Sequence, residues 1–449
     1  MGHKPSKEKT ERPESKNGKG SASNTPKTPH KPKFKPIIYG QTLSDIPSEY
    51  CKEITCQPDI DASAITGDNF TLLVRVLMGP PRTAEQLKAD EEEFYKNCNK
   101  SNTAVMPSIS AQDVTESTSK RSSMILSANE YQSESIPVPE APVNSLLESS
   151  DTLERKLIVD PNIKKNLKQQ KFQGSGGFGR VFKGYFPELP KEQRAVAIKK
   201  MKHMTEKEKR RNLNEIGHLE RLKHENIVSY YRSYLEAGEV WMVMELMEGG
   251  TLGEASQIYD FTDAHIAYVA REMLKAIEYL HAQGLAHRDL KSSNVMLTVS
   301  GQVKLIDFGF CIQVKEGITH MVGSPFWMPP EMIQGKAHGC PVDIWSLAVS
   351  LLEMLQKKPP NRNSSVKAMY VAGSCGLLPI LQQQRDKNKI SKDLHCFLSG
   401  CLEMDPTRRA TASQLLTHKF LDNAPDRSIM STIISSVFVA QMLTSGGFV

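Results

Sequence analysis

The segment that most constrains the fold is a glycine-rich run in which the glycines follow the spacing G-x-G-x-x-G: Gln173, Gly174, Ser175, Gly176, Gly177, Phe178 and Gly179. This spacing occurs in dinucleotide-binding folds and in hairpins that cover phosphates. A dinucleotide site requires a helix directly after the glycines, because the pyrophosphate rests on its N-terminus. Here residues 181–186 follow, and their aromatic and β-branched side chains favour a strand. The pattern predicts a phosphate-covering β-hairpin, with an ordinary hairpin turn as the alternative.

The charge of the chain is unevenly distributed. Residues 1–36 hold ten Lys or Arg against three Glu, a net of +7, whereas the whole chain of 449 residues has a net charge of +6. The rest is therefore close to neutral, so the basic pI reflects a tail and does not indicate a nucleic-acid-binding fold. The eight cysteines form no CxxC pair, which favours reduced thiols in the cytosol or nucleus over a disulfide framework. A cytoplasmic location is expected.

Composition divides the chain into five segments. Residues 1–36 are predicted to be a disordered basic, Pro-rich tail, and residues 98–166 a disordered Ser/Thr-rich linker. Between them, residues 37–97 hold a short apolar run and an acidic helical pattern that are too small for a separate domain. Residues 167–421 have the composition of a globular domain, and residues 422–449 are predicted to form a C-terminal tail helix.

Periodicity within residues 167–421 predicts an α+β fold of two lobes. Strands are expected at 172–186, 195–201, 227–234 and 240–246, with a basic helix at 202–222. After residue 250 the pattern is mostly helical, as in 264–282 and 342–355. A small β-rich lobe joined to a larger helical lobe is therefore expected.

Lys199 lies on the second predicted strand, and Glu215 on the basic helix after it. An ammonium group at this position reaches the α- and β-phosphates of a nucleotide when a carboxylate holds it in place. The alternative is two surface charges in a Lys-rich region. The apolar residues around Lys199 argue against this, because an unpaired charge would be buried there.

The most specific string is His287-Arg-Asp-Leu-Lys-Ser-Ser-Asn294, followed by Asp307-Phe-Gly. Asp289 is placed to orient a substrate hydroxyl and to accept its proton, and Lys291 to neutralise the transferring phosphoryl group. Asn294 and Asp307 are the expected Mg²⁺ ligands. His287 and Cys311 are expected to be structural. Together with the glycine hairpin, these residues indicate phosphoryl transfer from ATP.

These motifs resemble those of the eukaryotic protein kinases, and residues 307–313 and 321–328 resemble the PAK type of the sterile-20 group. The resemblance implies a Ser/Thr kinase that uses ATP and Mg²⁺ and answers to Rho-family GTPases, with Asp343 bracing the catalytic loop and Glu331 pairing with Arg409. It implies further that the adenine and hinge residues are Val181, Ala197, Met244, Glu245, Leu246 and Met296.

The resemblance extends to residues 46–96 with departures. The GTPase-binding motif of PAK-type kinases reads Pro-x-x-Phe-x-His-x-x-His, and here its positions hold Pro47, Tyr50, Lys52 and Thr55. GTPase binding and a purely autoinhibitory or vestigial role both remain open for this segment. Residues 65–67 and 85–95 look like the autoinhibitory part.

Other departures lie near residue 320. The family's activating Thr is replaced by His320, with Thr319 one residue earlier, and Pro329 stands where the family has Ala. Ser324 replaces the family's Thr conservatively.

Further alternatives concern the partners of the chain and its functional class. Residues 26–36 match a Src-homology-3 docking motif or a solvated linker, and Gly2 loosely fits N-myristoylation against a plain tail. A scaffold with an inactive kinase fold is the rival to an active enzyme, and a dehydrogenase is a distant third. The presence of all six expected catalytic and metal-binding residues favours the enzyme.

Overall fold

The computed structural model describes residues 72–73, 75–76, 150–160, 162–176 and 179–444. The predicted basic tail with its docking and myristoylation motifs, the GTPase-binding motif, and the loop residues Gly177 and Phe178 lie outside the described residues. Among the helices in this described part, none is both long and apolar enough to cross a membrane.

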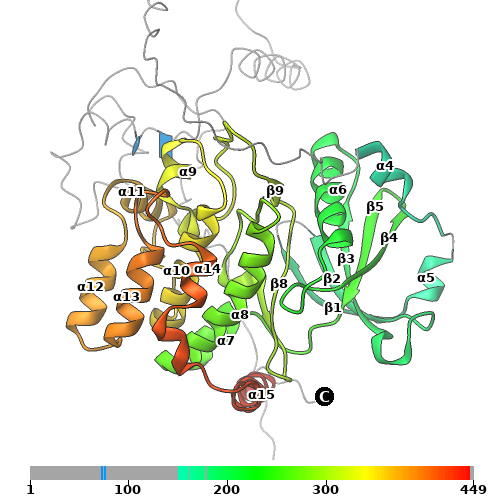
Figure 1. The fold of residues 1–449 in the computed structure, drawn as a ribbon. Helices are drawn as coiled ribbons and strands as arrows, with labels where there is room; N and C mark the ends of the chain where they lie inside the picture. Colours follow the sequence, from blue (N-terminus) through cyan, green and yellow to red (C-terminus); the bar gives the residue numbers. More distant parts are fainter. Residues whose placement is uncertain (1–71, 74, 77–149, 161, 177–178, 445–449) are drawn as a thin grey trace, which may run out of the picture. The chain divides into compact units, whose positions relative to one another are not determined.

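Within residues 167–421, the five longest strands precede most of the helices, as predicted from the sequence (Figure 1). The strands are β1 (Lys168–Gly176), β2 (Gly179–Tyr185), β3 (Ala195–Lys202), β4 (Tyr230–Glu236), β5 (Glu239–Glu245), β6 (Leu285–Ala286), β7 (Val295–Leu297), β8 (Val303–Leu305) and β9 (Ile312–Gln313). The α-helices are α4 (Ser150–Arg155), α5 (Ile163–Asn166), α6 (Glu206–Arg221), α7 (Leu252–Ile258), α8 (Asp263–His281), α9 (Pro330–Gln334), α10 (Pro341–Gln356), α11 (Ser365–Ser374), α12 (Leu378–Asp386), α13 (Lys392–Cys401), α14 (Ala412–Leu416) and α15 (Arg427–Thr444). Short 3₁₀ turns are η3 (Lys191–Gln193), η4 (Ser292–Asn294), η5 (Pro325–Trp327) and η6 (Lys419–Asn423).

The small lobe is a five-stranded antiparallel sheet with the order β1-β2-β3-β5-β4. β1 and β2 form a hairpin closed by the pair Gly176 and Gly179, so a strand follows the glycines and the predicted hairpin is confirmed. Along β3, side chains alternate between two hydrophobic clusters: Ala197 and Met201 belong to the main core, and Val196 and Ile198 to a separate cluster. The sheet is therefore buried on both faces.

The segment before the domain is folded over part of its length, which corrects the linker predicted for residues 98–166. Helix α4 packs against α6, and α5 places Ile163 in the second cluster of the sheet. Between them, Ile158 forms a parallel bridge opposite Tyr234 at the edge of the sheet. Its N–H donates to the Ser233 carbonyl at 3.1 Å, and its carbonyl accepts from the Leu235 N–H at 3.0 Å. These short elements could not be predicted from the Ser- and Glu-rich composition, because they are stabilised by a few apolar residues that follow no regular period.

The large lobe is built around α8 and α10, which are buried over most of their lengths. The remaining helices of this lobe surround them (Figure 1). The predicted helices at 264–282 and 342–355 are confirmed within one residue at each end. The two-lobed α+β architecture is therefore confirmed.

Helix α15 spans Arg427–Thr444, within the tail of residues 422–449 for which a helix was expected. Its buried residues Met430, Ile434, Val437 and Phe438 recur at helical spacing and belong to the main core. The Ser431 hydroxyl donates to the Val299 carbonyl at 2.6 Å. The helix therefore packs on the large lobe.

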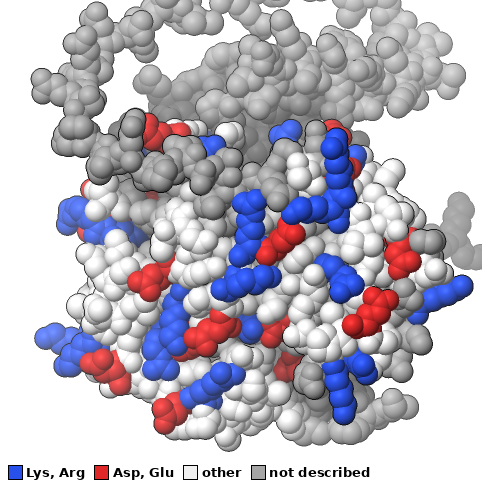
Figure 2. Space-filling model, turned by 45° about the vertical axis from the view of Figure 1, so that its right-hand side comes forward, with Lys and Arg blue, Asp and Glu red and all other residues white. Residues whose placement is uncertain are grey.

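Basic and acidic side chains are interspersed on the face of the molecule in Figure 2. This mixed surface agrees with the near-neutral charge outside residues 1–36.

Candidate active site

The residues expected around the adenine come from neighbouring strands. Ala197 of β3 lies opposite Met244 of β5, and Val181 of β2 lies opposite Lys199. Ala197 and Met244 belong to the main core, against which Val181 and Leu246 pack. Met296 on β7 is half-buried, and its backbone forms an isolated antiparallel β-bridge with Thr251.

The hairpin above these residues depends on Gly179, whose φ is +159°. A Cβ at this position would lie 2.7 Å from the carbonyl oxygen of Lys200, closer than real side chains come. The backbone of β2 can therefore approach β3 only with glycine here. Gln173 is exposed on β1, and Gly174 has open space around its Cα.

Lys199 and Glu215 form a buried ion pair between β3 and α6. The Nζ atom lies 2.6 and 2.9 Å from the two carboxylate oxygens, and the side chains are 10% and 2% exposed. A third charge is near, because Asp307 Oδ1 lies 3.5 Å from the same Nζ. Burial alone would lower the pKa of Lys199, but the attraction of Glu215 and Asp307 outweighs it and raises the pKa. The ammonium is thus charged and fixed in position.

Asp289 is the centre of a small hydrogen-bonded cluster. Lys291 Nζ donates to its Oδ2 at 2.9 Å, and the Ser324 hydroxyl donates to its Oδ1 at 2.7 Å. Lys291 Nζ also donates to Ser324 Oγ at 2.7 Å. A carboxylate, an ammonium and a hydroxyl are therefore held together, as a site that orients a hydroxyl nucleophile requires.

The loop that presents Asp289 is held by Asp343 on α10. The Oδ2 and Oδ1 atoms of Asp343 accept from the backbone N–H groups of His287 at 2.8 Å and Arg288 at 2.9 Å. Although burial favours its neutral form, the hydrogen bond and charge of His281 and the further bond from Arg288 hold the pKa of Asp343 below its usual value. The expected bracing role of Asp343 is supported by this geometry.

Arg288 adopts a φ of +65°, which is unusual for a residue other than glycine. Its Nε donates to the carbonyl of Phe310 at 2.9 Å. Arg288 is therefore held by Asp343 at its backbone N–H and by Phe310 at its side chain.

His287 is buried and structural, as the sequence predicted. Its Nδ1 accepts from the backbone N–H of Asp289 at 3.3 Å, and its Nε2 lies 3.3 Å from the carbonyl of Ile306. The ring packs edge-on against Phe308, with 4.9 Å between the centroids. Cys311 is also fully buried, and burial raises the pKa of its thiol.

Asn294 and Asp307 are brought together by the backbone, since the N–H of Ile306 donates to the carbonyl of Asn294 at 3.0 Å. The Asn294 amide nitrogen donates to the carbonyl of Asp289 at 2.8 Å, so the amide oxygen is the atom that would meet a metal. Although burial opposes it, Lys199 holds the pKa of Asp307 below its usual value. An amide oxygen and an ionised carboxylate are ligands that suit Mg²⁺.

The family described as "Protein kinase domain" matches residues 167–421, more than half of the chain. The chain belongs to the protein kinase family. Kinases of this family use ATP and Mg²⁺, and the oxygen ligands described above fit that metal.

Named relatives agree with this assignment. The "Probable serine/threonine-protein kinase mkcC" of Dictyostelium discoideum is 45% identical over 286 residues, which are 64% of this chain and 31% of that protein. The "Probable serine/threonine-protein kinase mkcB" of the same organism is 46% identical over 293 residues, 65% of this chain and 40% of the relative. The "Serine/threonine-protein kinase STE20" of Yarrowia lipolytica is 38% identical over 273 residues, 60% of this chain and 24% of the relative. The kinase therefore resembles the sterile-20 group, and its matched part spans less than half of each relative.

Two contacts of this kinase site were not assigned a role from the sequence. Asn214 on α6 donates from its side chain to the carbonyl of Cys311 at 2.8 Å, and Ser324 joins the Asp289 cluster. The position of Ser324 in the motif signalled its importance, but only the fold shows its partners. No sequence pattern pointed to Asn214.

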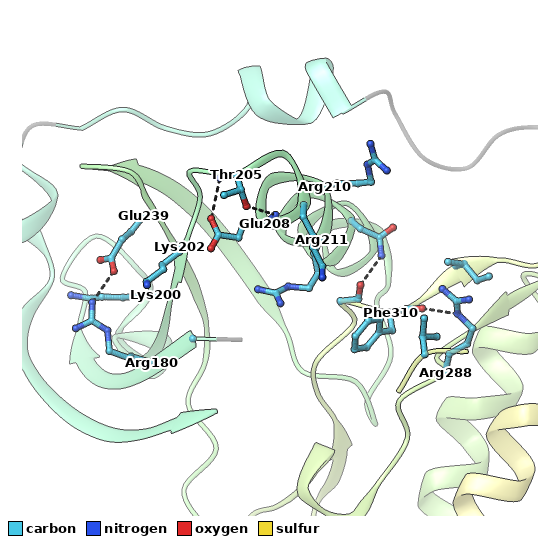
Figure 3. Close-up of a pocket in the computed structure, with 16 residues that line it drawn as sticks. Arg180, Lys200, Lys202, Thr205, Glu208, Arg210, Arg211, Glu239, Arg288 and Phe310 are labelled. Atoms are coloured by element: carbon cyan, nitrogen blue, oxygen red, sulfur yellow. Dashed lines mark hydrogen bonds and ion pairs between the residues drawn. The ribbon is translucent and has the colours of Figure 1, made fainter. Parts of the chain in front are cut away.

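A cavity of about 1480 Å³ opens between β2, β3, α6 and the Arg288–Phe310 contact (Figure 3). Seven basic side chains line it: Arg180, Lys200, Lys202, Lys207, Arg210, Arg211 and Arg288. The acidic residues of the lining are Glu208, which caps its own helix, and Glu239, which pairs with Arg180 at 2.7 Å. This excess of positive charge suits an anion. Arg210 and Arg211 of this lining lie on α6, and no sequence motif pointed to them.

The structure explains how Pro329 is accommodated. Pro329 is the N-cap of α9 with a φ of −79°, which proline adopts readily, and its carbonyl accepts from Ile333 N–H at 3.1 Å. Pro330 follows at the first helical position, where a missing N–H costs nothing. Both prolines therefore fit the start of the helix.

Proposed function

We propose that this protein is an active Ser/Thr protein kinase that transfers the γ-phosphoryl group of ATP to protein hydroxyls. The observation that carries the proposal is the cluster of Asp289, Lys291 and Ser324, with distances of 2.7 to 2.9 Å. Asp289 orients the substrate hydroxyl and accepts its proton, and Lys291 neutralises charge on the phosphoryl group. The names of the relatives support Ser and Thr as acceptors.

The nucleotide site of the proposal combines the other predicted residues. The glycine hairpin covers the phosphates, while Lys199, positioned by Glu215, binds the α- and β-phosphates. Asn294 and Asp307 would hold Mg²⁺, which neutralises charge on the phosphates. The hinge residues Glu245 and Leu246 follow Met244 beside the adenine. Glu245 itself is fixed by Lys304, whose Nζ lies 2.8 Å from its carboxylate.

Activation through Thr319 is a further part of the proposal. Thr319 and His320 are exposed, so a protein kinase can reach Thr319. A phosphate there would carry the negative charge that the basic cavity in Figure 3 suits. We expect Thr319→Ala to lower activity, and unchanged activity would contradict this role.

Autoinhibition by the N-terminal segment is supported by its short described part. Leu72, Leu73 and Val76 are buried in the main core, and a Cβ added at Gly373 of α11 would lie 3.1 Å from Leu72. Residues before the domain therefore contact the large lobe. Deleting residues 1–97 should raise basal activity, and an unchanged rate would contradict autoinhibition.

A response to Rho-family GTPases is the finer part of the proposal. It is supported by the STE20 relatives and by the motif at Pro47, Tyr50, Lys52 and Thr55. Docking of a Src-homology-3 domain on residues 26–36 and a cytoplasmic location are proposed from sequence composition alone.

The decisive experiment measures transfer from labelled ATP with Mg²⁺ to a basic protein substrate. The full chain is compared with Asp289→Asn, with and without GTP-loaded Rho-family proteins. Transfer by the full chain that falls by several orders of magnitude in the variant supports the enzyme. Absence of transfer under all conditions would favour a scaffold instead.

A further inference from the structure

Helix α6 connects the two halves of the nucleotide site. It presents Glu215 to Lys199 at 2.6 Å, and Asn214 to the Cys311 carbonyl at 2.8 Å, four residues beyond Asp307. A shift of this helix along its axis would therefore disturb the phosphate-binding lysine and the metal-binding segment together. Whatever fixes the helix also fixes the site.

Helix α4 packs against α6 from outside the kinase domain (Figure 1). Leu153 and Leu157 of this segment are 4% and 7% exposed and belong to the same core cluster as Leu213 and Ile216 of α6. Both leucines would be largely in water if the segment were detached. Their burial gives the contact a hydrophobic driving force.

Two ion pairs set the register of this contact. Near the start of α6, Lys209 Nζ lies 3.2 Å from Glu154 Oε1, and near its end Glu220 lies 3.3 Å from Lys156 Nζ. The segment of α4 supplies the acidic residue of one pair and the basic residue of the other, and α6 supplies their partners. Sliding the segment along α6 would therefore break both pairs. Glu154 also lies 3.8 Å from the buried ring of His203, in the loop that leads into α6. The contact therefore reaches both ends of the helix.

We propose that residues 150–157, which are helix α4 and the turn after it, form a positioning element for nucleotide binding. In this element Leu153, Leu157 and Glu154 hold α6 where Glu215 meets Lys199. The proposal rests on the proposed function for the meaning of the site. Its test, however, reads nucleotide binding, which does not require turnover.

The neighbouring helix α5 provides matched controls. Ile163 is 1% exposed and lies in the same preceding segment, but it packs in the cluster on the other face of the sheet. Lys164 pairs with Glu236 of β4 at 2.6 Å rather than with α6. Substitutions at these residues report the general cost of loosening the segment.

The first experiment measures the dissociation constant of Mg²⁺ with a non-hydrolysable ATP analogue for the full chain, together with amide hydrogen exchange in α6. We expect Leu153→Ala to weaken nucleotide binding about tenfold and to speed exchange in α6, because Lys199 loses its fixed partner. Ile163→Ala should lower the melting temperature similarly and leave nucleotide affinity within about twofold. Equal losses of affinity in both variants, or none in either, would overturn the proposal.

The second experiment swaps the charges of one pair. Glu154→Lys or Lys209→Glu alone should weaken nucleotide binding about two- to fivefold, as expected for one partly exposed ion pair. The double variant should recover most of the affinity, whereas Lys164→Glu should have no effect. Failure of the double variant to recover would show that the pair does not position the helix. If the unmodified chain binds nucleotide but transfers no phosphoryl group, the proposed function is contradicted and this inference is not.

Discussion

Arg409 and Glu331 lie 78 residues apart in the sequence and form a buried bidentate ion pair. The Nη1–Oε1 and Nη2–Oε2 distances are 2.7 and 2.9 Å, and the two side chains are 0% and 2% exposed. Arg409 Nη1 also donates to the carbonyl of Pro341, at the start of α10, at 2.9 Å. The pair thus ties α9 and the segment before α14 to the helix that braces the catalytic loop. It confirms the pairing implied by the resemblance.

Removing Arg409 should destabilise the large lobe strongly. We expect Arg409→Ala to lower the free energy of unfolding by about 3–5 kcal/mol, because Glu331 remains as a buried, unpaired carboxylate. Denaturant unfolding of the two proteins measures this difference. The adjacent Arg408 is the control, since its side chain is 73% exposed and pairs with Glu403 at 3.3 Å. Arg408→Ala should cost less than about 1 kcal/mol, and similar losses in both variants would contradict the argument.

Asp343 predicts a pH dependence of stability. Its folded pKa lies below the usual 3.8, so the ionised form contributes stability above that pH. This contribution is lost as the pH falls through the folded pKa. Asp343→Asn should lower the free energy of unfolding by about 2–4 kcal/mol near neutral pH, because its amide group cannot replace both acceptor oxygens.

Unfolding measured between neutral pH and pH 3 tests this prediction. The difference between Asp343→Asn and the unchanged protein should shrink below pH 3.8. A difference that stays constant over the whole range would show that the charge of Asp343 is not the source of the stability.

Much of the fold could be predicted because, in residues 167–421, the hydrophobic periodicity and the turn-forming residues indicate the same elements. The glycine run followed by aromatic and β-branched residues gave the β1–β2 hairpin, and α8 and α10 were within one residue of their predicted bounds. The strand expected from residue 227 begins instead at Tyr230. Ile227 and Val228, just before the strand, are apolar for another reason, since both are buried in the main core.

Other features could not be predicted from the sequence because they depend on contacts between distant residues. Helix α4 has only six residues, too short to show a period, and it is stabilised by packing on α6. The Ser324 hydroxyl donates a hydrogen bond to Asp289, which lies 35 residues earlier in the sequence. Motif spacing identified the residue types of the site but not which of them share hydrogen bonds.

Lys199 tests the nucleotide site most directly. Lys199→Met should abolish phosphoryl transfer, because no other group then anchors the α- and β-phosphates. Burial raises the pKa of Glu215, so the carboxyl group should take up a proton and the fold should persist. Transfer from labelled ATP and circular dichroism measure both expectations.

The control for this variant is the next residue of β3. Lys200 points to the other face of the sheet, with its Nζ 3.4 Å from the centre of the Trp241 ring. Lys200→Met should retain most of the transfer, because it removes one of seven basic side chains of the cavity and leaves the pair of Lys199 and Glu215 intact. Equal losses in the two variants would mean that the strand, rather than the Lys199 ammonium, is what the substitution disturbs.

Phe438 of α15 and the glycines that follow the hinge should be energetically coupled. A Cβ at Gly250 would collide with the Phe438 ring, and a Cβ at Gly249 would lie 3.2 Å from it. Gly250→Ala should therefore destabilise the protein by about 1–3 kcal/mol. Phe438→Ala should cost about 2–4 kcal/mol through the lost burial of a side chain that is 6% exposed.

The double variant distinguishes a local collision from a general loss. Without the ring, the alanine Cβ at position 250 still lies 2.8 Å from the Glu254 carboxylate but no longer meets its closest neighbour. The double variant should therefore lose about 1–2 kcal/mol less than the sum of the two single losses. Gly400→Ala, inside α13, is the control, because its Cβ would make only an ordinary contact of 3.6 Å with Ala410. This substitution should be neutral or stabilising. Additive losses, measured by denaturant unfolding, would show that α15 does not pack on the hinge through this ring.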